Sequence, residues 1–207
     1  MERSLPVSCS GRAARPIHRS ARVWRLRHDQ APAQIARLPA NSFPHNIALD
    51  EWSGSLYVTN SVLGVVWKIP ADGGTPTSWA TGPELQRTAL FGANGIAIHR
   101  GAVWVSNTDS GTIMEIPIQR DGSAGAIRTA VEGLSGGLDN FVLLGNDDTI
   151  IAALTLSNQV VLIDPDGQQQ AVLTAADGLS NPTAVACGMA RSMSATAPIS
   201  LKSIQIC

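Results

Sequence analysis

The chain alternates short apolar runs with polar breaks that contain Gly, Asp, Asn or Ser. Between residues 46 and 174 there are twelve such runs, each four to seven residues long. Their content of β-branched residues favours strands over helices. The predicted strands are 46–49, 56–60, 65–70, 77–80, 95–98, 103–107, 112–118, 127–131, 141–144, 149–154, 159–164 and 170–174. The pattern therefore predicts an all-β fold.

These runs form a repeat of four strands. Similar sequences open at Asn46-Ile-Ala-Leu, Asn94-Gly-Ile-Ala-Ile, Asp139-Asn-Phe-Val-Leu and Asn181-Pro-Thr-Ala-Val, so successive starts lie 48, 45 and 42 residues apart. Four strands in about 45 residues are typical of a β-propeller blade. An Asp-Gly pair follows each third strand, at 72–73, 121–122 and 166–167. Because Asp-Gly readily adopts the positive φ of tight hairpins, we interpret these aspartates as turn formers, not metal ligands.

The flanking segments set the predicted domain limits. Residues 22–27 and 33–38 resemble the last two strands of a blade, and residues 183–186 resemble a first strand. We therefore predict an Arg-rich irregular tail over 1–21, a partial propeller over 22–186 and an irregular tail over 187–207. A propeller closes into a ring of typically four to eight blades. About three full blades predict either a fragment or mispredicted gene product of a longer six-bladed protein, which we favour, or completion of the ring by another copy of the chain through open blade edges.

Charge and composition narrow the function classes. The net charge is −1, but residues 1–40 carry eight Arg against two acidic residues, leaving −7 for the remainder. This basic amino-terminal segment has three interpretations: a nucleic-acid-binding arm, a transit peptide or an irregular tail. We favour the irregular tail. No 18-residue apolar window and no signal-peptide core occur, so we expect a cytoplasmic chain as written, with no membrane or nucleic-acid partner. Three isolated Cys predict neither disulfides nor a zinc site.

Oxygen-bearing residues open the repeats and are the candidate functional residues. The innermost strand of each blade runs along the central channel, so Asn46, Asn94 and Asp139 are expected to converge on one funnel. Amide and carboxylate oxygens suit Ca²⁺, Mg²⁺ or Mn²⁺. The alternative is that these residues only cap strands or close turns. A G-x-S-x-G pattern at 133–137 lies between two blades, without the strand and helix that a nucleophile elbow needs.

Several of these segments also resemble a known family. They are Phe43-Pro-His-Asn46-Ile-Ala, Gly92-Ala-Asn94-Gly-Ile-Ala-Ile, Val103-Trp-Val-Ser-Asn107 and Leu138-Asp139-Asn140-Phe. They are similar to the gluconolactonase, senescence-marker-protein and luciferin-regenerating-enzyme family of six-bladed propellers, with its NHL-like and TolB-like relatives. The resemblance spans roughly residues 22–186.

The resemblance implies a divalent metal held by Asn94, Asp139 and a Glu from a further blade, with Asn46 contacting the substrate. Two positions depart from the family pattern, since Pro44 replaces an Arg and Asn140 replaces a Gly. The implied chemistry is lactone hydrolysis, with Asp139 as ligand or base and with Asn46 and His45 orienting a small lactone. The alternatives are a non-catalytic ligand- or protein-binding propeller and a propeller that shapes a natural-product intermediate.

Overall fold

A computed structural model describes residues 21–145, 147–187 and 204–206. These residues form three four-stranded antiparallel sheets and two strand pairs. The first sheet consists of β3 (Pro44–Asp50), β4 (Ser55–Asn60), β5 (Val65–Pro70) and β6 (Thr77–Thr81). The second consists of β7 (Ala93–His99), β8 (Ala102–Asn107), β9 (Thr112–Pro117) and β10 (Arg128–Val131). The third consists of β11 (Leu138–Leu144), β12 (Thr149–Leu154), β13 (Gln159–Ile163) and β14 (Gln169–Leu173).

The two strand pairs flank these sheets. β1 (Arg22–Arg25) pairs with β2 (Ala33–Arg37), and β15 (Val185–Cys187) pairs with β16 (Ile204–Ile206). β16 is a short strand within 187–207, for which the sequence predicted irregular structure. Its Ile-Gln-Ile alternation is the pattern that a strand pair accommodates. Of the predicted tails over 1–21 and 187–207, residues 1–20, 188–203 and 207 lie outside the described residues.

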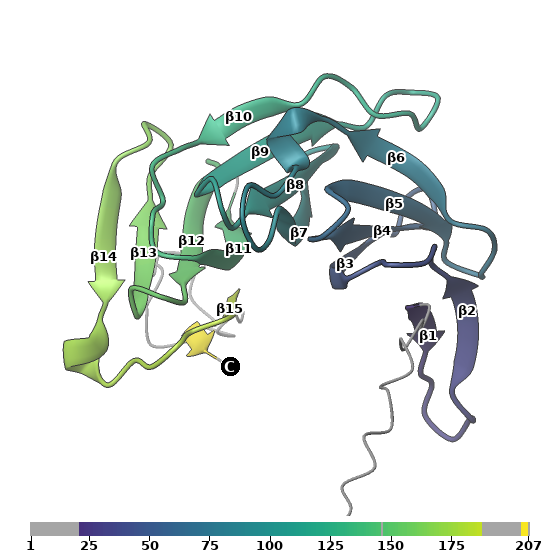
Figure 1. The fold of residues 1–207 in the computed structure, drawn as a ribbon, viewed down its shortest axis with the longest axis horizontal. Coiled ribbons are helices and arrows are strands. Elements are labelled where there is room, and N and C mark those ends of the chain that lie inside the picture. Colours follow the sequence, from purple (N-terminus) through teal and green to yellow (C-terminus); the bar gives the residue numbers. More distant parts are fainter. Residues whose placement is uncertain (1–20, 146, 188–203, 207) are drawn as a thin grey trace, which may run out of the picture.

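The sheets stand side by side in an arc (Figure 1), and in each one the strands run in chain order from the centre outwards. β3, β7 and β11 are innermost, and β7 contacts both of the others. Two short 3₁₀ turns, η1 (Pro83–Leu85) and η2 (Ala175–Asp177), lie in connections. The all-β prediction and its four-stranded blades are confirmed. No helix among the described residues has the length and apolar character needed to cross a membrane.

The turns confirm the predicted hairpin chemistry. Gly73, Gly122 and Gly167 have φ values of +103°, +78° and +82°. Each donates its backbone N–H to the carbonyl three residues earlier, at 2.8–2.9 Å. Gly adopts this left-handed region without the steric cost that a Cβ would bring. The Asp-Gly pairs therefore act as turn formers at the outer hairpins.

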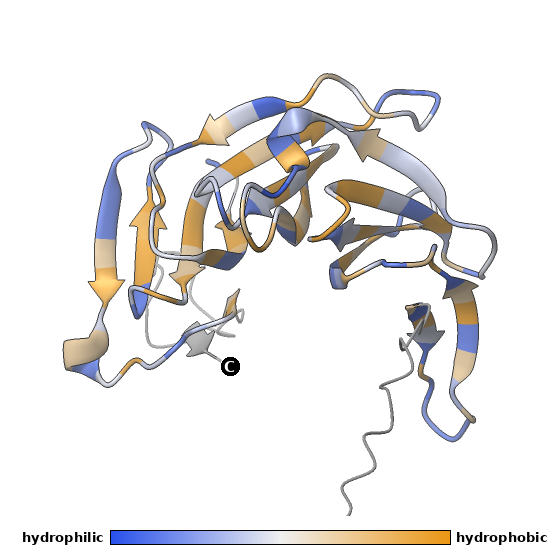
Figure 2. Ribbon diagram, viewed as in Figure 1, coloured by the Kyte–Doolittle hydropathy of each residue, from blue (hydrophilic) through white to orange (hydrophobic). Residues whose placement is uncertain are grey.

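The core lies between neighbouring sheets. One cluster joins Tyr57 and Val66 of the first sheet to Val103 and Met114 of the second, and another joins the second sheet to the third. Figure 2 shows hydrophobic residues concentrated in the strands and hydrophilic residues in the connecting loops. The outermost strands β6, β10 and β14 are mostly exposed. Packing of sheet against sheet thus fixes the innermost strands, whose ends carry the candidate residues.

Candidate functional site

The three innermost strands begin with the same irregularity, a β-bulge. Two first-strand residues there oppose one residue of the second strand. The bulged pairs are His45-Asn46, Asn94-Gly95 and Asp139-Asn140. By register, His45, Asn94 and Asp139 are equivalent residues. Asn46 is equivalent to Gly95 and Asn140. The sequence alignment on Asn46, Asn94 and Asp139 was therefore one residue out of register in the first blade.

Hydroxyl groups on the second strands hold the first two bulges in place. The Thr59 hydroxyl accepts the backbone N–H of Asn46 at 3.1 Å and donates to the carbonyl of Asn94 in the next blade. Ser106 repeats the arrangement one blade later: its hydroxyl accepts the N–H of the bulged glycine at 2.7 Å and donates to the carbonyl of Asp139, also at 2.7 Å. Asn94 and Asp139 are thus each held through the main chain by a hydroxyl of the preceding blade.

The bulge in β7 also needs a glycine. A Cβ at Gly95 would lie 2.7 Å from the carbonyl oxygen of Asp139 and 2.9 Å from the hydroxyl of Ser106. Real Cβ atoms do not approach other atoms so closely, so a side chain at this position would push the two strands apart. Gly95 permits β7 and β11 to approach at the site.

A cavity of about 430 Å³ opens beside these bulges. His45, Asn94 and Asp139 line it together with Thr108 and Thr155. The loops that precede β7 and β11 and the turn after β12 complete its walls. The structure therefore brings three equivalent bulge residues to one cavity.

Two residues that line this cavity each carry a buried oxygen without a hydrogen-bond partner among the described residues. Asn94 is 3% exposed, and its Nδ2 donates to the Thr108 hydroxyl at 2.6 Å, while its buried Oδ1 accepts no hydrogen bond. Asp139 Oδ2 accepts from the Thr155 hydroxyl at 3.4 Å, whereas its buried Oδ1 has no such donor. His45 Nε2 lies 3.6 Å from that oxygen. Buried polar atoms are rarely left unpaired, so both oxygens are candidates for binding a ligand.

Burial raises the pKa of the Asp139 carboxyl, since the charged form loses solvation. The charge of His45 and the hydrogen bond from Thr155 act in the opposite direction and offset only part of this effect. The carboxyl thus accepts a proton more readily than an ordinary aspartate. This is the behaviour required of a general base that later returns the proton.

The remaining sequence-predicted residue, Asn46, does not line this cavity. It lines a neighbouring groove of about 270 Å³ that Arg22, Val23 and Trp24 also border. Its Oδ1 accepts the backbone N–H of Ile47 at 2.7 Å. His45 also borders this groove, but unlike Asn46 it lines the cavity as well.

Ser135 of the G-x-S-x-G pattern lines the same cavity. It lies in the connection between β10 and β11, and its backbone N–H donates to the carbonyl of Gly133 at 2.9 Å. Neither a preceding strand nor a following helix flanks it directly, so the strained turn of a nucleophile elbow is not formed.

Sequence reasoning missed Asp109, which also lines the cavity. Its carboxylate accepts four backbone N–H groups, those of residues 88–91, at 2.6–3.2 Å. Burial acts to raise the pKa of Asp109, but these hydrogen bonds outweigh it and hold the pKa below its usual range. The sequence signal for this residue was the polar segment Asn107-Thr-Asp-Ser-Gly111, which begins at the last residue of β8. Asn107 of this segment donates to the carbonyls of Glu84 and Gln86.

The oxygen donors fit a hard divalent cation in part. Asn94 Oδ1 and Asp139 Oδ1 are of the type that Ca²⁺, Mg²⁺ and Mn²⁺ prefer. The described part of the chain contains no group of three or more His, Cys, Asp or Glu residues that could hold a metal ion. These residues therefore supply two ligands, and further ligands would have to come from water, substrate or elsewhere.

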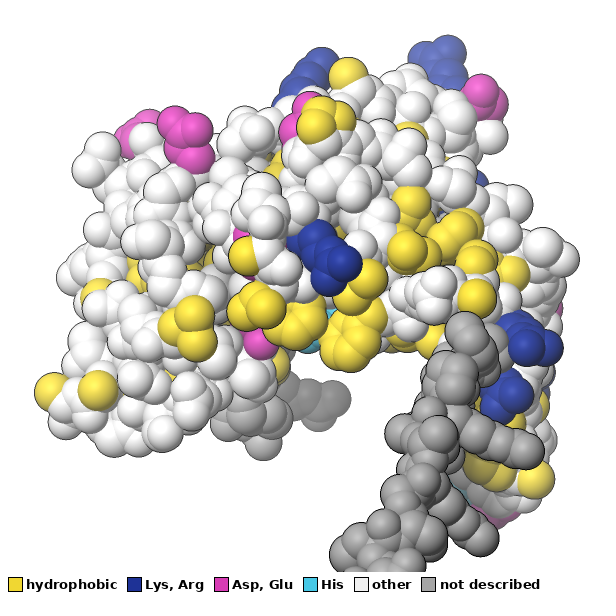
Figure 3. Space-filling model, viewed as in Figure 1, with side chains coloured by type: hydrophobic (Ala, Val, Ile, Leu, Met, Phe, Trp, Pro, Cys, Tyr) yellow, Lys and Arg dark blue, Asp and Glu magenta, His cyan; other side chains and the backbone are white. Residues whose placement is uncertain are grey.

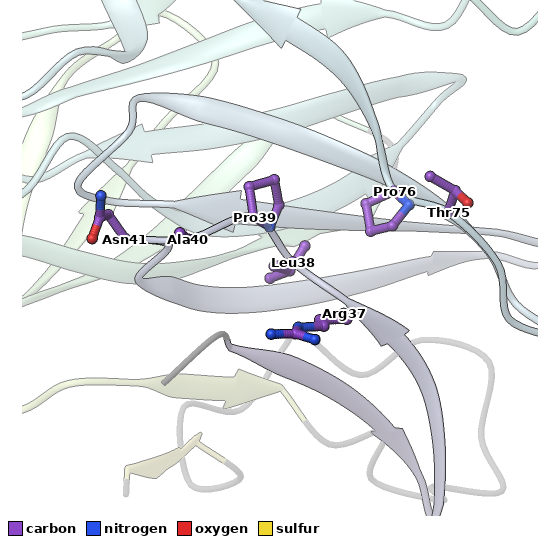
Figure 4. Close-up of a pocket in the computed structure, with 7 residues that line it drawn as sticks. All are labelled: Arg37, Leu38, Pro39, Ala40, Asn41, Thr75 and Pro76. Atoms are coloured by element: carbon purple, nitrogen blue, oxygen red, sulfur yellow. The ribbon is translucent and has the colours of Figure 1, made fainter. Parts of the chain in front are cut away.

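A second cavity, of about 500 Å³, lies between the β2–β3 connection and the β5–β6 loop (Figure 4). Its lining residues are Arg37, Leu38, Pro39, Ala40, Asn41, Thr75 and Pro76. None of these seven has a carboxylate, imidazole or thiol group. This cavity lacks the acid–base groups that line the first.

Solved structures with a similar arrangement identify the architecture. Virginiamycin B lyase from Staphylococcus aureus matches at 16% identity and a TM-score of 0.59, over 80% of this chain and 52% of that one. The fold is a β-propeller. A gluconolactonase from Xanthomonas campestris matches this propeller at 18% identity and a TM-score of 0.55, over 74% of this chain and 52% of that one. A structure described as a putative gluconolactonase matches at 19% identity and a TM-score of 0.59, over 83% of this chain and 61% of that one.

The chain spans about half to three-fifths of the length of these propellers. No protein-family model and no curated protein matches it. Because these structures include a lyase as well as gluconolactonases, and the identities are low, the similarity shows the fold and leaves function to the site.

Proposed function

We propose that the cavity binds and hydrolyses a small lactone with the help of a divalent cation, Ca²⁺, Mn²⁺ or Mg²⁺. Asn94 and Asp139 are the proposed ligands. The observation that carries the proposal is a pair of buried oxygens without hydrogen-bond donors on two residues that line one cavity, one of which has only His45 Nε2 nearby, at 3.6 Å. Leaving a buried polar atom unpaired costs about 1–3 kcal/mol, and a cation held by Asn94 and Asp139 would offset this cost.

A divalent cation polarises a lactone carbonyl and lowers the pKa of a bound water. The protein residues then have separate tasks. Asp139 takes up a proton from the attacking water and returns it to the leaving alkoxide. His45 lies beside it and orients a polar group of the substrate. Since Asn46 lines another groove, the proposal gives the orienting role to His45 alone.

The structural similarity to gluconolactonases supports this reaction class without deciding it. Hydrolysis of a lactone and binding without turnover both need a concave site with a small number of precisely positioned polar groups. A propeller that binds its ligand without turnover is therefore the other outcome that the experiment must separate.

The test is calorimetric titration of the purified chain with Ca²⁺, Mn²⁺ and Mg²⁺, with its oligomeric mass measured in the same buffer. We expect one saturable site per assembled propeller. Asp139→Asn and Asn94→Ala should abolish it. Asp166→Asn, which changes an exposed carboxylate in an outer hairpin turn, is the matched control and should leave binding unchanged.

Lactone hydrolysis would then be followed by proton release in the presence of the best cation. Unchanged cation affinity in Asp139→Asn would refute the ligand assignment. Saturable lactone binding without any proton release would favour the non-catalytic propeller.

A further inference from the structure

The mouth of the cavity is apolar, although its depths are polar. Leu90 and Leu156 both line it and are 65% and 76% exposed. Phe91 lines it as well and stacks on Phe43, with ring centroids 5.6 Å apart. Figure 3 shows hydrophobic side chains gathered along the inner rim of the arc. Exposed apolar groups that cluster at one concave site indicate a binding surface for apolar matter.

One side of this mouth is held rigidly. The backbone N–H groups of Leu90 and Phe91 donate to the Asp109 carboxylate at 2.9–3.2 Å. Asn107 fixes the start of the same loop by donating to two of its carbonyls. Leu90 is thus an exposed side chain on an anchored loop. A preformed apolar surface binds a ligand without the entropic cost of ordering a loop.

The other side of the mouth is adjacent to the polar groups. Leu156 directly follows Thr155, whose hydroxyl donates to Asp139 Oδ2. The backbone N–H of Leu156 donates to the carbonyl of Gly136 at 2.8 Å. A Cβ at Gly137 would lie 2.8 Å from Leu156 Cγ, so that glycine lets the leucine lie against the loop. Apolar and polar groups therefore meet within a single site.

We infer that the ligand is a lactone with an apolar substituent, as opposed to a polyhydroxylated sugar lactone. The substituent lies against Leu90, Phe91 and Leu156, and the lactone ring reaches Asn94 and Asp139. An alkyl chain or an aromatic ring would both supply this chemistry. The inference rests on the proposed function for the position of the lactone ring, and on the apolar mouth for the substituent.

The test is calorimetric binding of γ-lactones with alkyl chains of increasing length, with a phenyl-substituted γ-lactone and glucono-δ-lactone in parallel. Transfer of a methylene from water to an apolar site predicts a gain in affinity of about threefold to fourfold per CH₂ until the mouth is filled. The alkyl and phenyl arms separate the two kinds of substituent. Affinity that does not rise along the series, or tighter binding of glucono-δ-lactone, would overturn the inference.

Variants assign the effect to the mouth. Leu90→Ser and Leu156→Ser should each flatten the dependence on chain length, while Leu26→Ser, at a leucine 74% exposed and remote from this lining, should preserve it. Should a mouth variant fail to fold, the series on the unmodified protein still decides. A chain-length gain without cation dependence or turnover would refute the proposed hydrolase and support this inference. Cation-dependent hydrolysis of glucono-δ-lactone with no gain per methylene would do the reverse.

Discussion

Two carboxylates line the same cavity, and their surroundings differ. Asp109 accepts four backbone N–H groups, and both of its oxygens are paired. Asp139 accepts one hydroxyl hydrogen bond, and its Oδ1 is left without a donor. The pKa of Asp109 is lowered and that of Asp139 is raised. Location in a cavity therefore does not identify a functional carboxylate, whereas the set of hydrogen-bond partners separates a structural group from a candidate ligand.

The largest expected effect is loss of the structural carboxylate. Asp109→Ala leaves four N–H groups of the loop before β7 without their acceptor, and hydrogen bonds to a charged group predict a loss of about 3 kcal/mol in unfolding free energy. Urea denaturation at pH 7 measures it. Because the folded pKa is depressed, this stabilisation is present above the unfolded value of about 3.9 and is lost as pH falls through the folded pKa. Variant and parent should therefore converge in acid, and a pH-independent difference would contradict this account.

A smaller effect is expected where the two blades meet. Gly95→Ala places a Cβ against the Asp139 carbonyl and the Ser106 hydroxyl, and overpacking of this kind costs about 1–3 kcal/mol. The strands must separate, which displaces Asp139 from Asn94. We therefore expect both a lower denaturation midpoint and weaker cation binding. Gly101→Ala is a suitable control, because it has a positive φ but a Cβ there meets nothing within 4 Å. If Gly101→Ala weakened cation binding as much as Gly95→Ala, general instability would explain the loss of binding.

The strands and blades could be predicted from sequence because their signals are local. The runs 65–70 and 149–154 coincide with β5 and β12, since short apolar runs between turn formers determine where a strand begins and ends. The repeat also placed Asn94 and Asp139 on one cavity, because equivalent positions in successive blades face the same channel. Both predictions depend on patterns within about 45 residues.

The rest of the site depends on contacts that the sequence does not display. A bulge offers two residues to the channel, and spacing alone does not tell whether His45 or Asn46 faces the cavity. Asp109 binds backbone N–H groups, which have no side-chain signature. Leu90 and Leu156 meet at one mouth only because two blades pack together. The apolar character of the site was therefore absent from the sequence-based hypothesis.

The smallest effect is a gain in stability. Asp139→Asn removes a buried charge with an unpaired oxygen, and we expect it to raise the unfolding free energy at pH 7 by on the order of 1 kcal/mol. The folded pKa of Asp139 is raised, so its favourable contribution is complete below the unfolded value of about 3.9 and is lost as pH rises through the folded pKa. Thermal unfolding measured across pH should give the variant a higher midpoint than the parent near neutrality and the same midpoint in acid.

Addition of the cation sharpens this last comparison. A ligand that binds only the folded state stabilises it by mass action, so the best divalent cation should raise the midpoint of the parent and leave Asp139→Asn unchanged. The order of the two proteins would then reverse at pH 7. A variant less stable than the parent without cation would mean that Asp139, like Asp109, is a structural carboxylate. A stable variant that still responded to cation would mean that the ion binds elsewhere.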